Sequence, residues 1–435
     1  MPLVRVEISH LFGQIDHQLK IDTATRLTVF TAPNGYGKTV LLNLIDAFYR
    51  GDLPFILSVD FKQLEFIFEQ QSVHFNKLDE QRLSISHKIG NKTSGEQQLF
   101  DINDFSDGFN PKELDQIYQT IATTAQSQMD IWGNNDFAQQ CHEASVNQHP
   151  EAVRWNKQLY SHEIKALLKN QPVNLISSQR FHLTTQNETD LFNCNNETTL
   201  IAIEKCAIDL ASEFSAHQQN YEQTAKELDA TLPNRLLAQD QSCELEPKIL
   251  HKQYKNLYKT RIELESIGLL QPQVPPLPAP ADINQADVKL IDLLVKDLRT
   301  KLNLFQSLMN KVDLFIMMVN QNLSFKSLAL CPQNGFKVVC DNNKTIKLGI
   351  LSSGEQQLII LSYQIAMSMQ EHLLLLIDEP EAGISSQWQT NLLNTFKQLI
   401  KDFNTNIIIA TQSAHIIDNQ DNLIIKRCES CGHLH

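Results

Sequence analysis

Two short segments, far apart in the sequence, carry side chains suited to phosphate chemistry. The first, residues 32–39, reads Ala-Pro-Asn-Gly-Tyr-Gly-Lys-Thr, and the second, residues 378–381, reads Asp-Glu-Pro-Glu. A lysine and a hydroxyl group can hold phosphate and Mg²⁺, whereas adjacent carboxylates can complete the metal shell and accept a proton from water. Together the two segments predict a site for a magnesium-bound nucleoside triphosphate.

The first segment lies between a candidate strand and a candidate helix. Residues 27–31 form a short apolar run that predicts a buried strand, and apolar residues at 40–45 predict a helix. In this arrangement backbone N–H groups and the helix N-terminus face the phosphates, Lys38 reaches the β and γ phosphates, and Thr39 can ligate Mg²⁺. The predicted nucleotide-binding residues of this segment are Asn34, Gly35, Tyr36, Gly37, Lys38, Thr39 and Val40.

One position departs from the usual phosphate-binding loop. Ala32 stands where the pattern has its first glycine, and its methyl group is tolerated if the φ angle at that turn is negative. Gly35 and Gly37 retain the other flexible positions of the loop.

The second segment follows a run of five apolar residues, 373–377. A strand that is apolar on both faces is typical of the centre of a parallel sheet, and ligands collect at the carboxyl ends of such strands. We therefore expect Asp378 to hold the Mg²⁺ shell and Glu379 to accept a proton from the attacking water.

A six-residue string, SGEQQL, occurs twice, at 94–99 and at 353–358. Apolar residues after the second copy predict a helix, so Ser352, Ser353 and Gly354 lie at a helix N-terminus, where free N–H groups attract an anion. The first copy has no such helix after it and is expected to be a polar loop. Only the second copy is predicted to contact a nucleotide.

With these segments in this order, the chain resembles the ATP-binding-cassette (ABC) ATPases of the SMC, RecF and OLD type. The resemblance covers about residues 1–75 and 310–420. Within that group the chain is most similar to the standalone ATPase subunits of bacterial anti-phage defence systems, such as PtuA of Septu and AriA of PARIS. The fold it implies is α/β, a P-loop ABC-type ATPase head with a mixed sheet, flanking helices and an antiparallel β subdomain, interrupted by a helical or coiled-coil insertion.

The resemblance also implies a head-to-head dimer, or a larger even assembly, that closes around ATP and Mg²⁺. Ser352 and Gly354 of one subunit would contact the γ-phosphate bound to the other. Gln179 stands near the end of a candidate strand, where the family carries its Q-loop, and is implied to sense Mg²⁺ and water. A solvated glutamine before a surface arginine is an equally good interpretation of that residue type.

A further family element is the switch after the candidate strand at 407–410, where this chain has Gln412 and relatives usually have histidine. An amide can donate to the γ-phosphate but cannot take up a proton, so contact without proton handling and slow turnover are expected. His415 could substitute, although a histidine there is more often structural. The implied catalytic residues are Glu379, Lys38, Gln179 and Gln412, and the implied metal ligands are Thr39, Asp378 and Gln179.

These patterns predict an N-terminal lobe at 1–180, an insertion at 181–310 with a Pro-rich connector at 271–280, and a C-terminal lobe at 311–435. Within the insertion, apolar residues from Ile203 to Leu228 recur at steps of three and four, as in a heptad stripe. The stripe is consistent with a projecting arm and equally with a packed helical bundle.

Composition limits the alternatives. The formal charge is −13, which disfavours a broad nucleic-acid face but leaves a local one open, and no apolar run is long enough to span a membrane. Without a signal-peptide pattern the protein is expected in the cytoplasm, with its eight cysteines reduced. The C-terminal tail has the spacing of half a zinc site or of a complete compact one, although a disordered tail is favoured. Its candidate ligands are Cys428, Cys431, His433 and His435.

The hypothesis that follows is an ATPase, converting ATP and water to ADP and phosphate, whose ATP-dependent dimerisation regulates a partner effector in anti-phage defence. Because no nuclease constellation is visible, the effector is expected to be a nuclease or toxin encoded nearby. A DNA-binding ATPase of RecF or SMC type in repair is the main alternative. A transporter subunit is disfavoured by the helical insertion and by Glu355, which follows the signature glycine.

Overall fold

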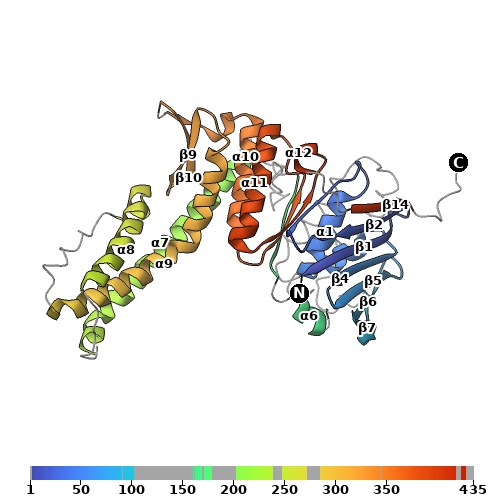
Figure 1. The fold of residues 1–435 in the computed structure, drawn as a ribbon, viewed down its shortest axis with the longest axis horizontal. Coiled ribbons are helices and arrows are strands. Elements are labelled where there is room, and N and C mark those ends of the chain that lie inside the picture. The colour runs from blue at the N-terminus through green and yellow to red at the C-terminus, as the bar shows by residue number, and fades with distance from the viewer. Residues whose placement is uncertain are drawn as a thin grey trace, which may run out of the picture. The chain divides into compact units, whose positions relative to one another are not determined.

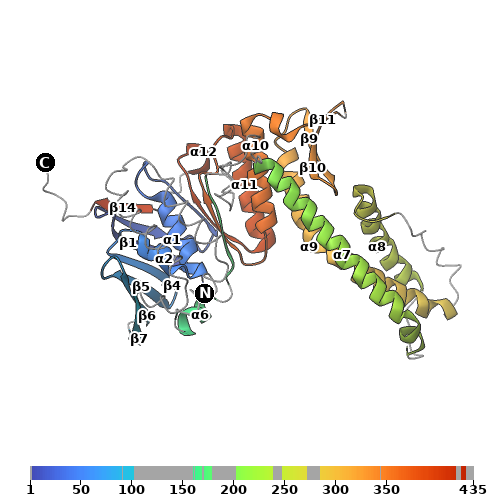
Figure 2. The same cartoon turned by 180° about the vertical axis from the view of Figure 1, so that it is seen from behind.

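The chain forms two compact units, residues 1–197 with 368–435 and residues 198–367. They are seen from two sides in Figures 1 and 2. The computed structural model describes residues 2–90, 92–101, 160, 162–168, 171–178, 202–238, 247–271, 285–342, 344–417 and 423–427.

The first unit contains a four-stranded parallel sheet with the strand order β3-β13-β12-β8. Its strands are short apolar runs, and every residue of β12 is buried, as expected of a strand covered on both faces. Because the strands are parallel, their carboxyl ends lie along one edge. The bounds are β3 Leu27–Phe30, β8 Val173–Ile176, β12 Leu374–Asp378 and β13 Asn406–Ala410.

Helix α1, Lys38–Arg50, joins this sheet to a second one in the same unit. It contacts β8, β12 and β13, and its Phe48 ring stacks on Phe66 of the second sheet with 4.0 Å between ring centroids. Eleven of its 13 residues are buried, so it forms the core between the two sheets. Among the described residues of this unit, the other helices are α2 Leu53–Ser58, α6 His162–Leu168, α11 Ser386–Phe403 and α12 Ala414–Ile417.

The second sheet is antiparallel, with the order β14-β2-β1-β4-β5-β6-β7. The first SGEQQL copy lies within β7, where Gln98 pairs with Ile85 of β6. The prediction of a loop there is wrong. The segment becomes a strand because its backbone hydrogen-bonds to β6, and a polar sequence gives no local signal of such pairing. The bounds are β1 Leu3–Leu11, β2 Ile15–Lys20, β4 Gln63–Phe68, β5 Gln71–Lys77, β6 Arg82–Ile89, β7 Lys92–Asp101 and β14 Leu423–Arg427.

In the second unit, the described residues form long helices and a small antiparallel sheet of order β11-β10-β9. Helix α9 packs against both α7 and α8, and Leu250, Tyr254 and Val295 belong to the α8–α9 core. The bounds are α7 Ala202–Leu237, α8 Pro247–Ile267, α9 Gln285–Asn320, β9 Lys326–Cys331, β10 Gly335–Cys340, β11 Thr345–Ile346, a 3₁₀ helix Leu348–Ile350 and α10 Ser353–Ser368.

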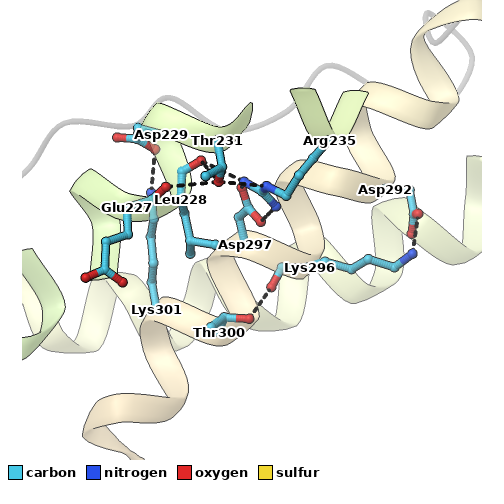
Figure 3. A network of polar contacts seen from close by, with 10 residues as sticks. All are labelled: Glu227, Leu228, Asp229, Thr231, Arg235, Asp292, Lys296, Asp297, Thr300 and Lys301. Carbon is cyan, nitrogen blue, oxygen red and sulfur yellow. Dashed lines mark hydrogen bonds and ion pairs between the residues drawn. The ribbon is translucent and has the colours of Figure 1, made fainter. Parts of the chain in front are cut away.

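A polar network fastens α7 to α9 (Figure 3). The two terminal guanidinium nitrogens of Arg235, Nη1 and Nη2, donate to the carboxylate of Asp297 at 2.6 and 2.7 Å, and Lys301 pairs with Asp229 at 3.0 Å. The two parallel hydrogen bonds between Arg235 and Asp297 are directional, so they fix the register of α7 against α9.

None of the helices described is long and apolar enough to cross a bilayer. The proposed zinc ligands in the C-terminal tail lie outside the described residues. The fold class expected from the sequence, α/β with an antiparallel β subdomain and a helical insertion, is confirmed.

Candidate functional site

The candidate site lies at the carboxyl edge of the parallel sheet, where the loops after β3, β12 and β13 meet. The loop after β3 is residues 31–37, β12 is followed by Glu379, and β13 is followed by Thr411 and Gln412. Residues separated by more than 300 positions in the sequence are therefore brought together by strand order alone.

The loop after β3 has the backbone that its glycines permit. Gly35 and Gly37 have φ angles of 81° and 77°, in the left-handed region, and a Cβ at Gly37 would come within 2.8 Å of the Leu11 side chain. Ala32 has no positive φ angle, so the methyl group is accommodated as expected. Gly37 precedes α1 without a side-chain cap, which leaves the first N–H groups of the helix available to an anion.

Lys38 is buried, at 7% exposure, and its Nζ donates to the carbonyl oxygen of Ala32 at 2.8 Å. Burial lowers the pKa of the Lys38 ammonium, and the carboxylates of Glu379, Asp378 and Glu381 act in the opposite direction. The ammonium group thus lies among acidic groups and backbone carbonyls, in a position to contact a phosphate.

Thr39 and Asp378 meet directly, and Thr39 Oγ1 donates to Asp378 Oδ2 at 2.7 Å. Asp378 is 1% exposed, and burial raises its pKa to about 6, assisted by the charge of Glu379 and opposed by hydrogen bonds from Thr39 and Ser178 and by the charge of Lys38. A hydroxyl and a carboxylate at hydrogen-bond distance are the oxygen donors that Mg²⁺ prefers beside phosphate. The residues present therefore fit this ion.

Glu379 is held from two directions. Its backbone N–H donates to the carbonyl of Ala410 at 2.9 Å, and its φ angle is 43°, which is unusual outside glycine. The side-chain amide of Gln412 donates to Glu379 Oε1 at 3.2 Å and also to Asn34 Oδ1. Gln412 therefore connects the phosphate-binding loop to the candidate base.

The second SGEQQL copy begins α10 in the other unit. Ser352 and Glu355 form a capping box, in which Glu355 N–H donates to Ser352 Oγ at 3.3 Å and Ser352 N–H donates to Glu355 Oε2 at 3.0 Å. Partial burial raises the pKa of Glu355, but hydrogen bonds from Lys326 and Ser352 lower it overall. Ser352 and Ser353 are exposed and Gly354 is half-buried, so this helix tip is accessible.

The structure thus brings together Lys38, Thr39, Asp378, Glu379 and Gln412, with Asn34 beside them. Among the other predicted residues, Val40 is buried in α1 and the Tyr36 carbonyl accepts a hydrogen bond from His17 Nε2 at 2.7 Å. Gln179 lies outside the described residues. His415 is exposed on α12.

Three residues at this edge were not predicted from the sequence. Glu381 joins the loop after β12 to the loop after β13, and Gln389 of α11 hydrogen-bonds Ser413 of one loop and Ile384 of the other. The only sequence signal was the second glutamate of Asp-Glu-Pro-Glu, and nothing in the pattern around Gln389 or Ser413 distinguished them from other polar residues of a helix start and a loop.

Fold and site geometry together define a P-loop ATPase of the α/β class. Residues 1–417 match the family described as AAA ATPase domain, and the chain therefore belongs to that family. No curated protein matches the sequence. One similar solved structure is the Smc head domain with an extended coiled coil from Pyrococcus furiosus, bound to the C-terminal domain of ScpA. The match covers 98% of this chain and 96% of the Smc chain. Its sequence identity is 12% and its TM-score 0.34.

Proposed function

We propose that the protein binds Mg²⁺ and ATP at the carboxyl edge of the parallel sheet and hydrolyses the bond to the terminal phosphate, releasing ADP and phosphate. The observation that carries this proposal is the meeting of Lys38, Thr39, Asp378 and Glu379 at one edge. Lys38 balances phosphate charge, Thr39 and Asp378 hold the metal, and Glu379 accepts a proton from water. Bound Mg²⁺ supplies charge neutralisation at the phosphate oxygens.

The test of this activity is phosphate release from ATP by the purified chain, with and without Mg²⁺. Hydrolysis is expected only with the metal and should be lost in Lys38→Ala. Lys20, which is exposed at the end of β2, supplies the matched control, and Lys20→Ala should hydrolyse ATP at the unmodified rate. Equal rates in the two variants would contradict the assignment.

The site is proposed to be completed by a second copy of the chain, through Ser352, Ser353 and Gly354. Support comes from the motif resemblance and from the accessible N-terminus of α10. ATP-dependent association, measured by light scattering, is expected to be lost in Ser353→Arg and kept in Ser94→Arg, the equivalent serine of the other SGEQQL copy. Association that survives Ser353→Arg would contradict the role of this helix tip.

The biological role proposed for this association is regulation of a separate effector protein in anti-phage defence. It is supported only by the resemblance of the motifs to standalone defence ATPases. Expression of the chain with its genomic neighbours, followed by phage challenge, tests it. Protection that requires both a neighbouring gene and Lys38 is expected, and protection that is unchanged in Lys38→Ala would contradict it.

A further inference from the structure

Glu381 ties the loop after β12 to the loop after β13. The backbone N–H of Gln412 donates to Glu381 Oε1 at 2.6 Å, which is a short N–H···O hydrogen bond. The other oxygen, Oε2, is buried and has no hydrogen-bond donor within the described part of the chain. A buried carboxylate oxygen without a hydrogen bond is unfavourable for the stability of the fold. The position of Glu381 therefore needs an explanation other than packing.

A second connection joins the same two loops a few residues further on. Ser413 Oγ donates to Gln389 Oε1 at 2.5 Å, and Gln389 Nε2 donates to the carbonyl of Ile384 at 3.0 Å. Gln389 lies in the first turns of α11, which begins after its N-cap Ser385. One amide side chain thus fixes the loop after β13 to both a helix and the loop before it.

Both connections hold the backbone at Gln412, the first through its own N–H and the second through the neighbouring Ser413. The side-chain amide of Gln412 has two hydrogens, and among the described residues it donates to Asn34 Oδ1 and Glu379 Oε1. Both contacts depend on where the backbone at Gln412 lies. That backbone is held on one side by Glu381 and on the other, through Ser413, by Gln389.

We propose that Glu381 and Gln389 are positioning residues, which hold the loop after β13 so that Gln412 reaches the phosphate-binding loop and Glu379 together. The two residues act through Gln412 and do not themselves touch the substrate. Their effect on turnover rests on the proposed ATPase function, whereas the physical link between the loops does not. The two parts are therefore tested separately.

The link is tested without nucleotide, by hydrogen exchange of the Gln412 amide, followed by NMR or on short peptides spanning 411–416. Glu381→Met removes the acceptor, and exchange is expected to become about tenfold faster, the effect of one ordinary hydrogen bond. Glu381→Gln keeps an acceptor oxygen of the same reach and should restore most of the protection. Unchanged exchange in Glu381→Met overturns the proposal.

The effect on turnover is tested by ATP hydrolysis of Glu381→Met, Gln389→Met and the double variant. Each single variant is expected to lower kcat about tenfold with KM for ATP changed less than about twofold, because positioning acts on the reacting geometry rather than on binding. The double variant should be little worse than either, since both act through one loop. Gln387, exposed on the same helix, supplies the control Gln387→Met.

The outcomes separate the two proposals. If the unmodified protein hydrolyses no ATP, the proposed function fails, and hydrogen exchange alone still decides the link. If the protein is active and both single variants keep normal kcat despite faster exchange, the positioning role is overturned while the ATPase assignment stands.

Discussion

Buried carboxylates are held in opposite ways in the two units. At the site, Asp378 is 1% exposed beside Glu379, and burial raises its pKa to about 6. In the helical unit, Asp297 is 6% exposed and receives both short hydrogen bonds of Arg235 (Figure 3). In the helical unit the buried carboxylate faces an arginine, whereas at the site it lies beside a second carboxylate and accepts hydrogen bonds from Thr39 and Ser178.

This difference separates a carboxylate that stabilises the fold from carboxylates whose proposed role is chemical. A buried charge with a bidentate partner lowers the energy of the folded chain once its desolvation has been offset. A buried carboxylate next to another carboxylate raises that energy, and such arrangements concentrate at functional sites. Removing a charge at the site should therefore lower activity without lowering stability. Removing the charge of Asp297 should lower stability without lowering activity.

The largest effect is expected for Glu379→Gln. The amide keeps the shape of the side chain and an oxygen that can accept from Gln412, but it cannot take a proton from water. The rate of ATP hydrolysis should fall at least about 100-fold, while ATP binding, measured by calorimetry, is retained. Glu371→Gln, an exposed glutamate near the start of the same strand, is the control and should keep the full rate. An unchanged rate in Glu379→Gln would falsify the assignment of the base.

The next effect in size is a loss of stability in Asp297→Asn. Arg235 then keeps a hydrogen-bond acceptor but loses the opposite charge that it contacts at 2.6 Å. The free energy of unfolding of the helical unit should fall by about 1–3 kcal/mol, measured by urea titration followed by circular dichroism. ATP hydrolysis per folded molecule should stay within about twofold of the original.

Asp378→Asn should change the free energy of unfolding in the opposite direction and stabilise the folded chain. The pKa of Asp378 is about 6 in the folded chain and 3.8 in the reference state, so the folded state holds the proton more tightly and stability falls as pH rises through this range. Removing the charge is expected to raise the free energy of unfolding by about 1–2 kcal/mol at pH 7 without nucleotide. The gain should disappear below about pH 4. A loss of stability at pH 7 would contradict the electrostatic account of the site.

How far the sequence predicts such a site depends on which contacts are local. The strand, loop and helix around Lys38 follow from a continuous pattern of apolar residues and glycines, and so does the strand before Asp378. The contacts of Glu381, Gln389 and Ser413 depend on how two loops approach each other in space, which no periodicity encodes. Local sequence patterns therefore indicate the residues that are predicted to react, but they do not indicate the residues that hydrogen-bond the surrounding loops.

The two SGEQQL copies show the same limit from another side. At 353–358 the string begins a helix because apolar residues follow it, and the local signal is sufficient. At 94–99 the identical string is part of β7 because β6 lies beside it. Six residues with no strong preference take the structure that their partners supply.

The smallest effect is expected where an ion pair faces water. Lys301 and Asp229 are 3.0 Å apart, but the Asp229 side chain is 70% exposed, so solvent and salt screen the pair. In a double-mutant cycle of Lys301→Met and Asp229→Asn, the coupling free energy should be below about 0.5 kcal/mol. The same cycle on Arg235 and Asp297 should give a larger coupling, because the Asp297 carboxylate is buried and accepts two hydrogen bonds. If the two couplings were equal, burial of the carboxylate would not decide the strength of a pair in this unit, and the contrast with Asp378 would need a cause other than desolvation.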